Sequence, residues 1–250
     1  MDHEACTDAL GRELDRFVSL LTSADPDAPV PTCPEWTVRD LTDHLGYVHR
    51  WAGEMVRDRS PERLPREEMT FETATDDDLA RWLRAGGDAL IATLRDADPD
   101  DEMWAWGPDQ RVRFWSRRQL HETAIHRIDL ARAVGAPVVL DAPVALDSIL
   151  ELLECLPSAA DFSPHIAELR GDGETIGLRA TDSEGAGTIM LIPDGFTFTR
   201  ALGDADATIS GTINDLALVI SRRHDPNAPG VEFHGRTELI AHWLDHSWLG

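Results

Sequence analysis

Apolar side chains recur at helical spacing through the first half of the chain. In residues 5–21, one apolar stripe runs along a single face, as expected of a helix packed on one side. A second helix is predicted to begin after Thr37, a good N-cap whose capping box Asp40 can complete. A third is expected to begin near Thr75, where three aspartates lie at the positive end of the helix dipole.

A fourth helix is predicted over residues 116–135. Ser116 serves as the expected N-cap with Gln119 at the box position, and Gly135 followed by Pro137 marks the end. Four long helices with facing apolar stripes predict an N-terminal four-helix bundle.

The pattern changes after Pro137. One more helix is expected over residues 142–156, followed by short β-rich runs separated by Gly-Asp and Asp-Gly turn signals. Two further stretches return to helical spacing, so the second half is predicted to be a small α+β domain. The boundary is expected within residues 135–142, which gives domains of residues 1–137 and 138–250. The predicted strands are residues 175–180, 187–192, 196–200 and 207–211, and the two late helices are residues 212–223 and 236–246.

Charge and composition argue against several classes of protein. A net charge of −23 argues against nucleic acid and anionic membranes as partners, because both require a basic surface. No apolar run reaches the ~20 residues that span a bilayer, and the charged N-terminus lacks the apolar core of a signal peptide. A cytoplasmic protein is therefore expected. Three cysteines without a C-x-x-C motif argue against a disulfide scaffold, although Cys33, just before a predicted helix, could be a reactive thiol.

The fourth predicted helix carries two histidines and a glutamate in "HETAIH". Residues four apart lie roughly 40° apart around a helix, whereas residues five apart diverge by roughly 140°. Glu122 and His126 can therefore reach one ion together, and His121 is expected on another face. This spacing disfavours the H-E-x-x-H metalloprotease motif.

A third ligand is needed because catalytic zinc usually takes three protein ligands and keeps one position open. His44 is the best candidate, since it lies on the apolar stripe of the second helix; His49, five residues later, is expected toward solvent or a cavity rim. The spacing alone leaves an alternative open, in which His44 is a hydrogen-bonded core residue and the Glu122–His126 pair is a surface contact.

Two blocks containing these residues, "CPEWTVRDLTDHLGYVHRWA" and "FWSRRQLHETAIHRIDLARAVG", closely resemble the motif blocks of the mycothiol-dependent maleylpyruvate isomerase family. The resemblance covers essentially the whole chain. It implies a DinB-like four-helix bundle followed by a small α+β domain of sterol-carrier-like shape.

The resemblance also implies a set of site residues. It assigns zinc to His44, Glu122 and His126, with water completing the coordination, and mycothiol as the thiol cofactor or co-substrate. It further implies a catalytic Arg after an apolar helix of the second domain, which is Arg222 here. Because Ser221 stands where the family has Gly, Arg223 remains a possible substitute.

The function expected on these grounds is thiol addition to a small electrophile, by a zinc-dependent thiol S-transferase or a maleylpyruvate-type cis–trans isomerase. A zinc-dependent hydrolase is an alternative, because zinc can also activate water. A non-catalytic protein that binds metal or an apolar ligand is a second alternative. Three tryptophans before the fourth helix could stack on the sugar of mycothiol or pack between the domains: Trp104, Trp106 and Trp115.

Overall fold

The structure is a computed structural model of the whole chain, and it describes all residues except 66–68, 72–73, 76–77, 225–228 and 249–250. It divides into two compact units. The first comprises Met1–Ala105 and Asp109–Val139, and the second comprises Trp106–Pro108 and Leu140–Gly250.

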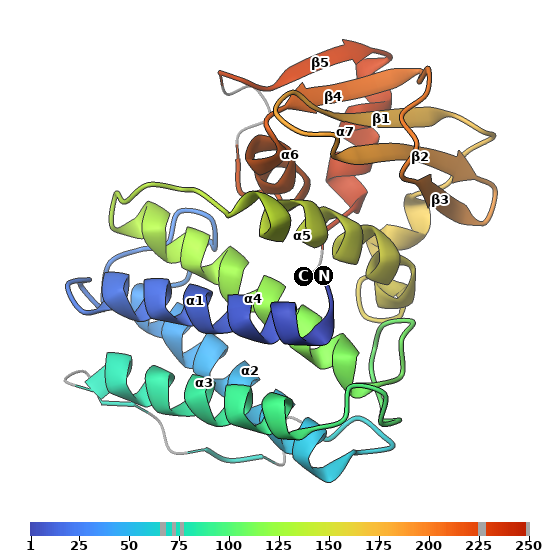
Figure 1. Cartoon of the computed structure of the whole chain (residues 1–250). Helices are drawn as coiled ribbons and strands as arrows, with labels where there is room; N and C mark the ends of the chain where they lie inside the picture. The colour runs from blue at the N-terminus through green and yellow to red at the C-terminus, as the bar shows by residue number, and fades with distance from the viewer. Residues whose placement is uncertain (66–68, 72–73, 76–77, 225–228, 249–250) are drawn as a thin grey trace. The chain divides into compact units, whose positions relative to one another are not determined.

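The first unit is a bundle of four long helices (Figure 1). Helix α1 contacts α3 and α4, and α2 likewise contacts both α3 and α4. Because α2 and α4 are neighbours, side chains from these two helices can meet. The helices are α1 His3–Leu21, α2 Val38–Asp58, α3 Leu79–Asp96 and α4 Val112–Ala133.

The facing stripes of the bundle form an apolar core. Each helix contributes large side chains with less than 2% of their surface exposed, as the predicted periodicity requires. At about 1.5–3 kcal/mol for each large apolar side chain removed from water, this core is the main source of stability of the bundle. The core includes Leu10, Leu14, Phe17, Leu41, Leu45, Met55, Leu83, Leu90, Leu94, Trp115 and Leu120.

The ends of α2 and α4 test the predicted caps. Thr37 and Asp40 form the expected capping box at the start of α2. The predicted start of α4 at Ser116 is wrong, because the helix already begins at Val112 and the Ser116 hydroxyl donates to the Arg113 carbonyl inside it. Its end is as predicted: Gly135 adopts a φ of 68°, which suits glycine in the left-handed region.

Helix α3 begins at Leu79 rather than near Thr75, and its N-cap Asp78 makes no side-chain capping hydrogen bond. Two of the aspartates expected in its first turn, residues 76 and 77, lie outside the described residues. Among the described residues, none of the helices is both long enough and apolar enough to cross a membrane.

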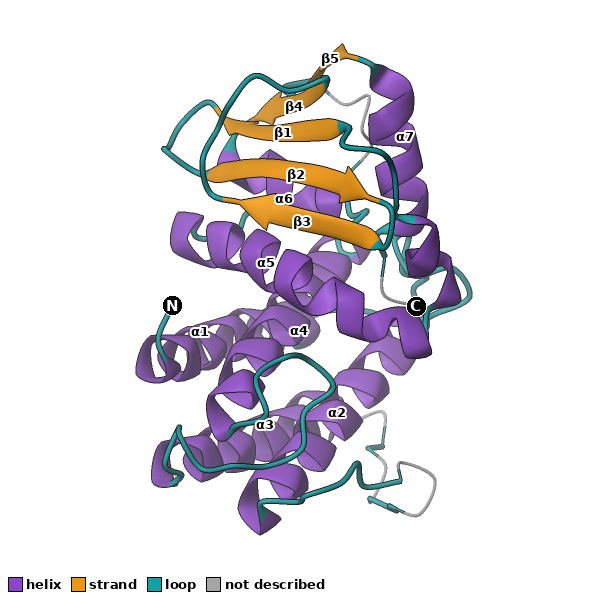
Figure 2. Ribbon diagram, turned by 90° about the vertical axis from the view of Figure 1, so that its right-hand side faces the viewer, coloured by secondary structure: helices purple, strands orange, loops and turns teal. Residues whose placement is uncertain are grey.

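The second unit combines a mixed five-stranded sheet with helices (Figure 2). The strand order is β3-β2-β1-β4-β5, and only the β1–β4 pair is parallel. The strands are β1 Thr175–Ala180, β2 Ala186–Ile192, β3 Gly195–Thr199, β4 Ala207–Gly211 and β5 Glu232–Gly235. The helices are α5 Ala142–Cys155, α6 Ile213–Ile220 and α7 Thr237–His246, with short 3₁₀ turns at Leu156–Asp161 and Pro164–Glu168.

Helices α5, α6 and α7 all contact the sheet, and α5 also packs against α6. The four predicted strands and three predicted helices are present with small shifts at their ends, so the predicted fold class, a helical bundle followed by an α+β domain, is confirmed. The sequence pattern missed β5, because this edge strand is short and mostly exposed and therefore lacks an alternating apolar pattern.

Candidate metal centre

Helix α4 buries an unusual number of polar and charged side chains for a helix of a bundle core. Such side chains are costly to bury unless they are paired, so their concentration on one helix marks a candidate site. The buried polar residues of α4 are Ser116, Arg118, Gln119, His121, Thr123, His126, Arg127 and Asp129.

Three predicted ligands from α2 and α4 converge beside this helix. The Nε2 atom of His44 lies 3.1 Å from Oε1 of Glu122, and Nε2 of His126 lies 3.4 Å from the same oxygen. The two imidazole rings are 5.0 Å apart between centroids and meet edge to face. The structure thus brings together His44, Glu122 and His126.

These separations suit a shared cation. Zinc with bonds of about 2.0–2.1 Å to nitrogen and oxygen holds neighbouring tetrahedral ligands about 3.3 Å apart. The three donor atoms lie within 4.8 Å of one another, so they could hold such an ion with small adjustments. The side chains of His44 and Glu122 are 26% and 19% exposed, so the group is partly open to solvent.

Charged neighbours keep the glutamate ionised. Burial raises the pKa of the Glu122 carboxyl, but hydrogen bonds with His126 and His44 outweigh it and hold that pKa well below its usual value. The charge of Arg118, whose guanidinium donates to Oε2 of Glu122 at 2.9 Å, acts in the same direction. Oε2 is therefore occupied by Arg118, while Oε1 faces the two imidazoles.

The pKa of His126 is shifted the opposite way. Burial lowers it, but hydrogen bonds with Asp129, Cys33 and Glu122 overcome burial and raise the pKa well above the usual histidine value. Without a metal, His126 therefore holds a second ring proton between two carboxylates. A metal ion at Nε2 would have to displace that proton.

The two other histidines of α2 and α4 do not join the ligand group. His49 was expected toward solvent or a cavity rim, and this is wrong: it is fully buried, and its Nε2 lies 2.8 Å from the Thr123 hydroxyl. His44 on the same helix stays partly exposed, whereas burial lowers the pKa of His49 to about 3. His121 is also buried and belongs to neither ligand group among the described residues.

Arg222, the predicted catalytic residue, belongs to the second unit. It follows the C-cap Ser221 of α6, is exposed, and adopts a φ of 59°. The left-handed residue is therefore Arg222 and not Ser221, so replacing the family's glycine by Ser221 introduces no backbone strain. The Arg222 guanidinium lies 5.7 Å from the ring centre of Trp248. Arg223 instead donates to the Ser221 carbonyl at 2.9 Å.

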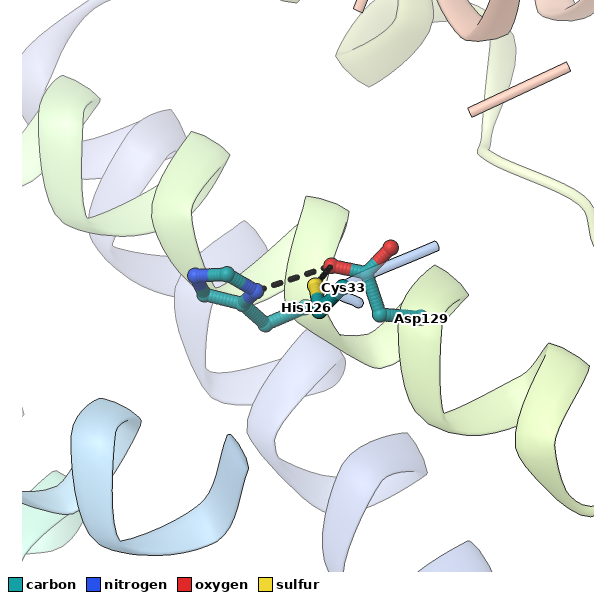
Figure 3. Close-up of side chains that lie close together, drawn as sticks. All are labelled: Cys33, His126 and Asp129. Atoms are coloured by element: carbon teal, nitrogen blue, oxygen red, sulfur yellow. Dashed lines mark hydrogen bonds and ion pairs between the residues drawn. The ribbon is translucent and has the colours of Figure 1, made fainter. Parts of the chain in front are cut away.

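A cluster that the sequence analysis missed adjoins His126 (Figure 3). Asp129, one turn further along α4, accepts from the Thr32 hydroxyl at 2.6 Å and from the Cys33 thiol at 3.4 Å. Its Oδ2 also lies 2.9 Å from Nδ1 of His126. The i, i+3 spacing of His126 and Asp129 was the signal that could have identified this carboxylate. Cys33, His126 and Asp129 form a second group with ligand-like geometry.

Tryptophans differ in their relation to the site. Trp115, which was expected to reach a ligand or a domain contact, is instead fully buried against Trp51 and Trp104 within the bundle. Trp106 contacts Phe162 within the second unit. Trp36, which the sequence analysis did not single out, lies with its ring centre 4.9 Å from that of His44 and 6.1 Å from that of His126.

Comparison with known proteins places the chain in a family. Two crystal structures of the mycothiol-dependent maleylpyruvate isomerase, one of a histidine-to-alanine mutant, resemble the chain with TM-scores of 0.62 for the mutant and 0.60. Both are 14% identical to it, and each match covers 93% of this chain and 93% of the other, which establishes a shared fold. No curated protein sequence matches the chain. Residues 7–131, half of the chain, match the model described as the mycothiol maleylpyruvate isomerase N-terminal domain, so the chain belongs to this family.

Proposed function

We propose that this protein is a zinc-dependent, mycothiol-using enzyme that adds the thiol to a small electrophile, as a cis–trans isomerase or a thiol S-transferase. The observation that carries the proposal is the convergence of two imidazole nitrogens and one carboxylate oxygen at a partly exposed position. Membership of the mycothiol maleylpyruvate isomerase family supports the choice of thiol and reaction class.

His44, Glu122 and His126 would hold the metal ion. When bound, a divalent ion at such a site stabilises the thiolate form of a coordinated thiol. This matters because an ordinary cysteinyl thiol has a pKa of about 8.5 and is mostly protonated at neutral pH. Arg118 contributes to keeping Glu122 ionised, and the Trp36 ring lies beside the rings of His44 and His126.

In the proposed reaction the thiol first gives up its proton to solvent, and the thiolate sulfur then forms a bond with one alkene carbon of the electrophile. The electron pair of the double bond moves onto the conjugated carbonyl, and the remaining single bond can rotate. For an isomerase, the electron pair returns, the sulfur–carbon bond breaks and the thiolate is regenerated. For an S-transferase, the carbon beside the carbonyl takes up a proton and the adduct is the product.

Arg222 is proposed to bind the anionic part of the electrophile. An exposed guanidinium can donate two parallel hydrogen bonds to a carboxylate or to oxygen that gains negative charge during the reaction. We further propose a cytoplasmic location, because the chain has three free cysteines and small thiols stay reduced in that compartment.

Metal content tests the site first. The purified wild-type chain is expected to contain about one zinc ion per chain, and His126→Ala is expected to lose it because one of three protein ligands is removed. The control is His121→Gln, which alters a buried histidine of the same helix that lies outside the proposed ligand set. Unchanged zinc in His126→Ala would contradict the proposed site.

Turnover tests the reaction. Wild-type protein with mycothiol and an α,β-unsaturated acid is expected to give the thiol adduct or the trans isomer, detected by mass spectrometry and chromatography, whereas His126→Ala should give neither. In the same assay, Arg222→Gln is expected to raise KM for a carboxylate electrophile, with Arg223→Gln as the comparison. Thiol-independent hydrolysis of an amide conjugate would instead favour a zinc hydrolase and overturn the role of the thiol.

A further inference from the structure

Asp129 is a fully buried carboxyl group whose two oxygens are both engaged. The Thr32 hydroxyl donates to Oδ1, and the Cys33 thiol donates to Oδ2. Nδ1 of His126 lies 2.9 Å from that same Oδ2 (Figure 3). Its buried charge is thereby compensated by three neighbours.

The contact with Asp129 determines where the ring hydrogen of His126 lies. A carboxylate oxygen can only accept a hydrogen bond, so Nδ1 of His126 must carry the hydrogen that joins it to Oδ2. In the neutral imidazole, the lone pair then lies on Nε2. Nε2 is the nitrogen that faces Glu122, 3.4 Å from its Oε1.

The two ligand groups compete for one imidazole. A neutral ring has a single lone pair, so His126 cannot serve both the group with His44 and Glu122 and the group with Cys33 and Asp129. Occupation of the second group would require loss of the Cys33 proton and of the hydrogen bonds that Cys33 and His126 now make with Oδ2 of Asp129. The first group requires none of these changes.

The residues that hold Asp129 belong to a loop with its own hydrogen bonds. The Val30 amide donates to the Trp36 carbonyl, the Cys33 amide to the Val30 carbonyl and the Trp36 amide to the Cys33 carbonyl. Thr32 and Cys33 are thereby held in place before α2 begins.

We propose that Asp129 is a positioning residue that fixes the tautomer and the orientation of His126, and that Thr32 and Cys33 in turn fix Asp129. The inference rests on the proposed metal site and adds three residues to it. Partners of this kind orient histidine ligands in metal proteins, and their loss typically weakens metal binding 10–100-fold.

Cobalt affinity of the full-length chain tests this role. Asp129→Asn keeps the shape of the side chain but allows its NH₂ group to face Nδ1, which favours the tautomer with the hydrogen on Nε2. Titration with Co²⁺, followed by its visible absorption, is expected to show about 10–100-fold weaker binding in Asp129→Asn. Thr32→Val should weaken binding less, because Asp129 keeps its other donors. Cys33→Ser retains a donor and should bind cobalt as the wild type does.

The tautomer is read separately from ¹H–¹⁵N NMR spectra of the imidazoles in the zinc-loaded protein. His126 is expected to carry its hydrogen on Nδ1 in the wild type and to lose that signature in Asp129→Asn. Unchanged cobalt affinity and an unchanged tautomer in Asp129→Asn would overturn the proposal. Loss of cobalt binding in Cys33→Ser, to the extent seen in His126→Ala, would also overturn it, because the sulfur would then be a ligand.

The outcomes separate this inference from the proposed function. If the wild type bound neither cobalt nor zinc, the proposed function would fail, and the inference, which rests on that site, would fail with it. If the wild type bound cobalt and Asp129→Asn bound it equally tightly, the metal site would stand and the positioning role would fall. Should Asp129→Asn not fold, Thr32→Val decides: unchanged cobalt affinity in that variant would overturn the proposal.

Discussion

Two carboxylates of the helical bundle meet basic side chains of α4 in different ways. Glu13 on α1 accepts from Arg16 at 2.6 Å and from Arg127 at 2.8 Å, and its side chain is 1% exposed. Glu122 on α4 accepts from Arg118 through one oxygen only, and its other oxygen faces the imidazoles of His44 and His126.

The difference lies in what the basic partner can do. A guanidinium stays charged and has no lone pair, so the Glu13 cluster is closed to any metal. An imidazole can give up its proton and offer a lone pair to a cation. One bundle thus holds a buried ion pair that matters for stability beside a cluster that is able to change partners.

The largest expected effect is a loss of stability when the cluster of Glu13 with Arg16 and Arg127 is broken. Glu13→Gln removes the negative charge between Arg16 and Arg127 and leaves the buried Arg127 guanidinium uncompensated. We expect the free energy of unfolding to fall by about 3–5 kcal/mol, measured by chemical denaturation. Zinc content of the folded fraction should stay unchanged. Loss of zinc together with unchanged stability would contradict the assignment of Glu13 to structure.

The matched substitution at Glu122, which faces His44 and His126, is expected to weaken metal binding. Glu122→Gln replaces a charged ligand with a neutral amide of the same shape, so Co²⁺ affinity should fall at least about 100-fold, which is beyond the range for residues that only support a ligand. Equilibrium titration with Co²⁺ measures this affinity. Stability of the metal-free chain should change less than in Glu13→Gln, because Glu122 is partly exposed. Equal metal affinity in wild type and Glu122→Gln would remove the carboxylate from the site.

A smaller effect is expected for the pH dependence of the free energy of unfolding, which His49 influences. Burial lowers the pKa of His49 to about 3, and the charge of Glu122 raises it too little to compensate. The unfolded chain, with a histidine pKa of about 6.5, binds the proton more readily. The contribution of neutral His49 to the free energy of unfolding is therefore fully present above pH ~6.5, and it decreases as the pH falls towards 3.

Between pH 6.5 and 5, this linkage is expected to cost about 2 kcal/mol of the free energy of unfolding. Denaturation of the metal-free wild type and of His49→Gln at both pH values isolates the effect, because other titrating groups are common to the two proteins. A pH dependence that is the same in both would show that His49 does not titrate as its burial predicts.

Several features of the site could be predicted from local sequence. The i, i+4 spacing of Glu122 and His126 follows from helix geometry, and the apolar stripe around His44 indicated the side of α2 that faces the bundle. The cap at Thr37 was equally local, because a capping box depends on residues only three positions apart. The boundary between residues 137 and 138 and the role of Arg222 stay predictions.

Other features depended on contacts between distant residues. The 96-residue separation of Cys33 and Asp129 gives no local signal, and neither does the contact between Trp36 and the two histidines. His49 was misplaced because the helical pattern gives the direction of a side chain but not how deeply the neighbouring helix covers it. Strand β5 was missed because pairing with β4, not its own composition, makes it a strand.

Local sequence patterns predicted the long helices and all strands of the described sheet except β5, because periodicity, caps and turns act over a few residues. They also determined that a carboxylate and an imidazole share one face of α4. The position of an imidazole from α2 beside this group, and the contacts of Thr32 and Cys33 with Asp129, depend on how the helices and loops pack. The physical reason is that ligand geometry and burial depend on how helices pack, and packing joins residues whose separation along the chain leaves no local pattern.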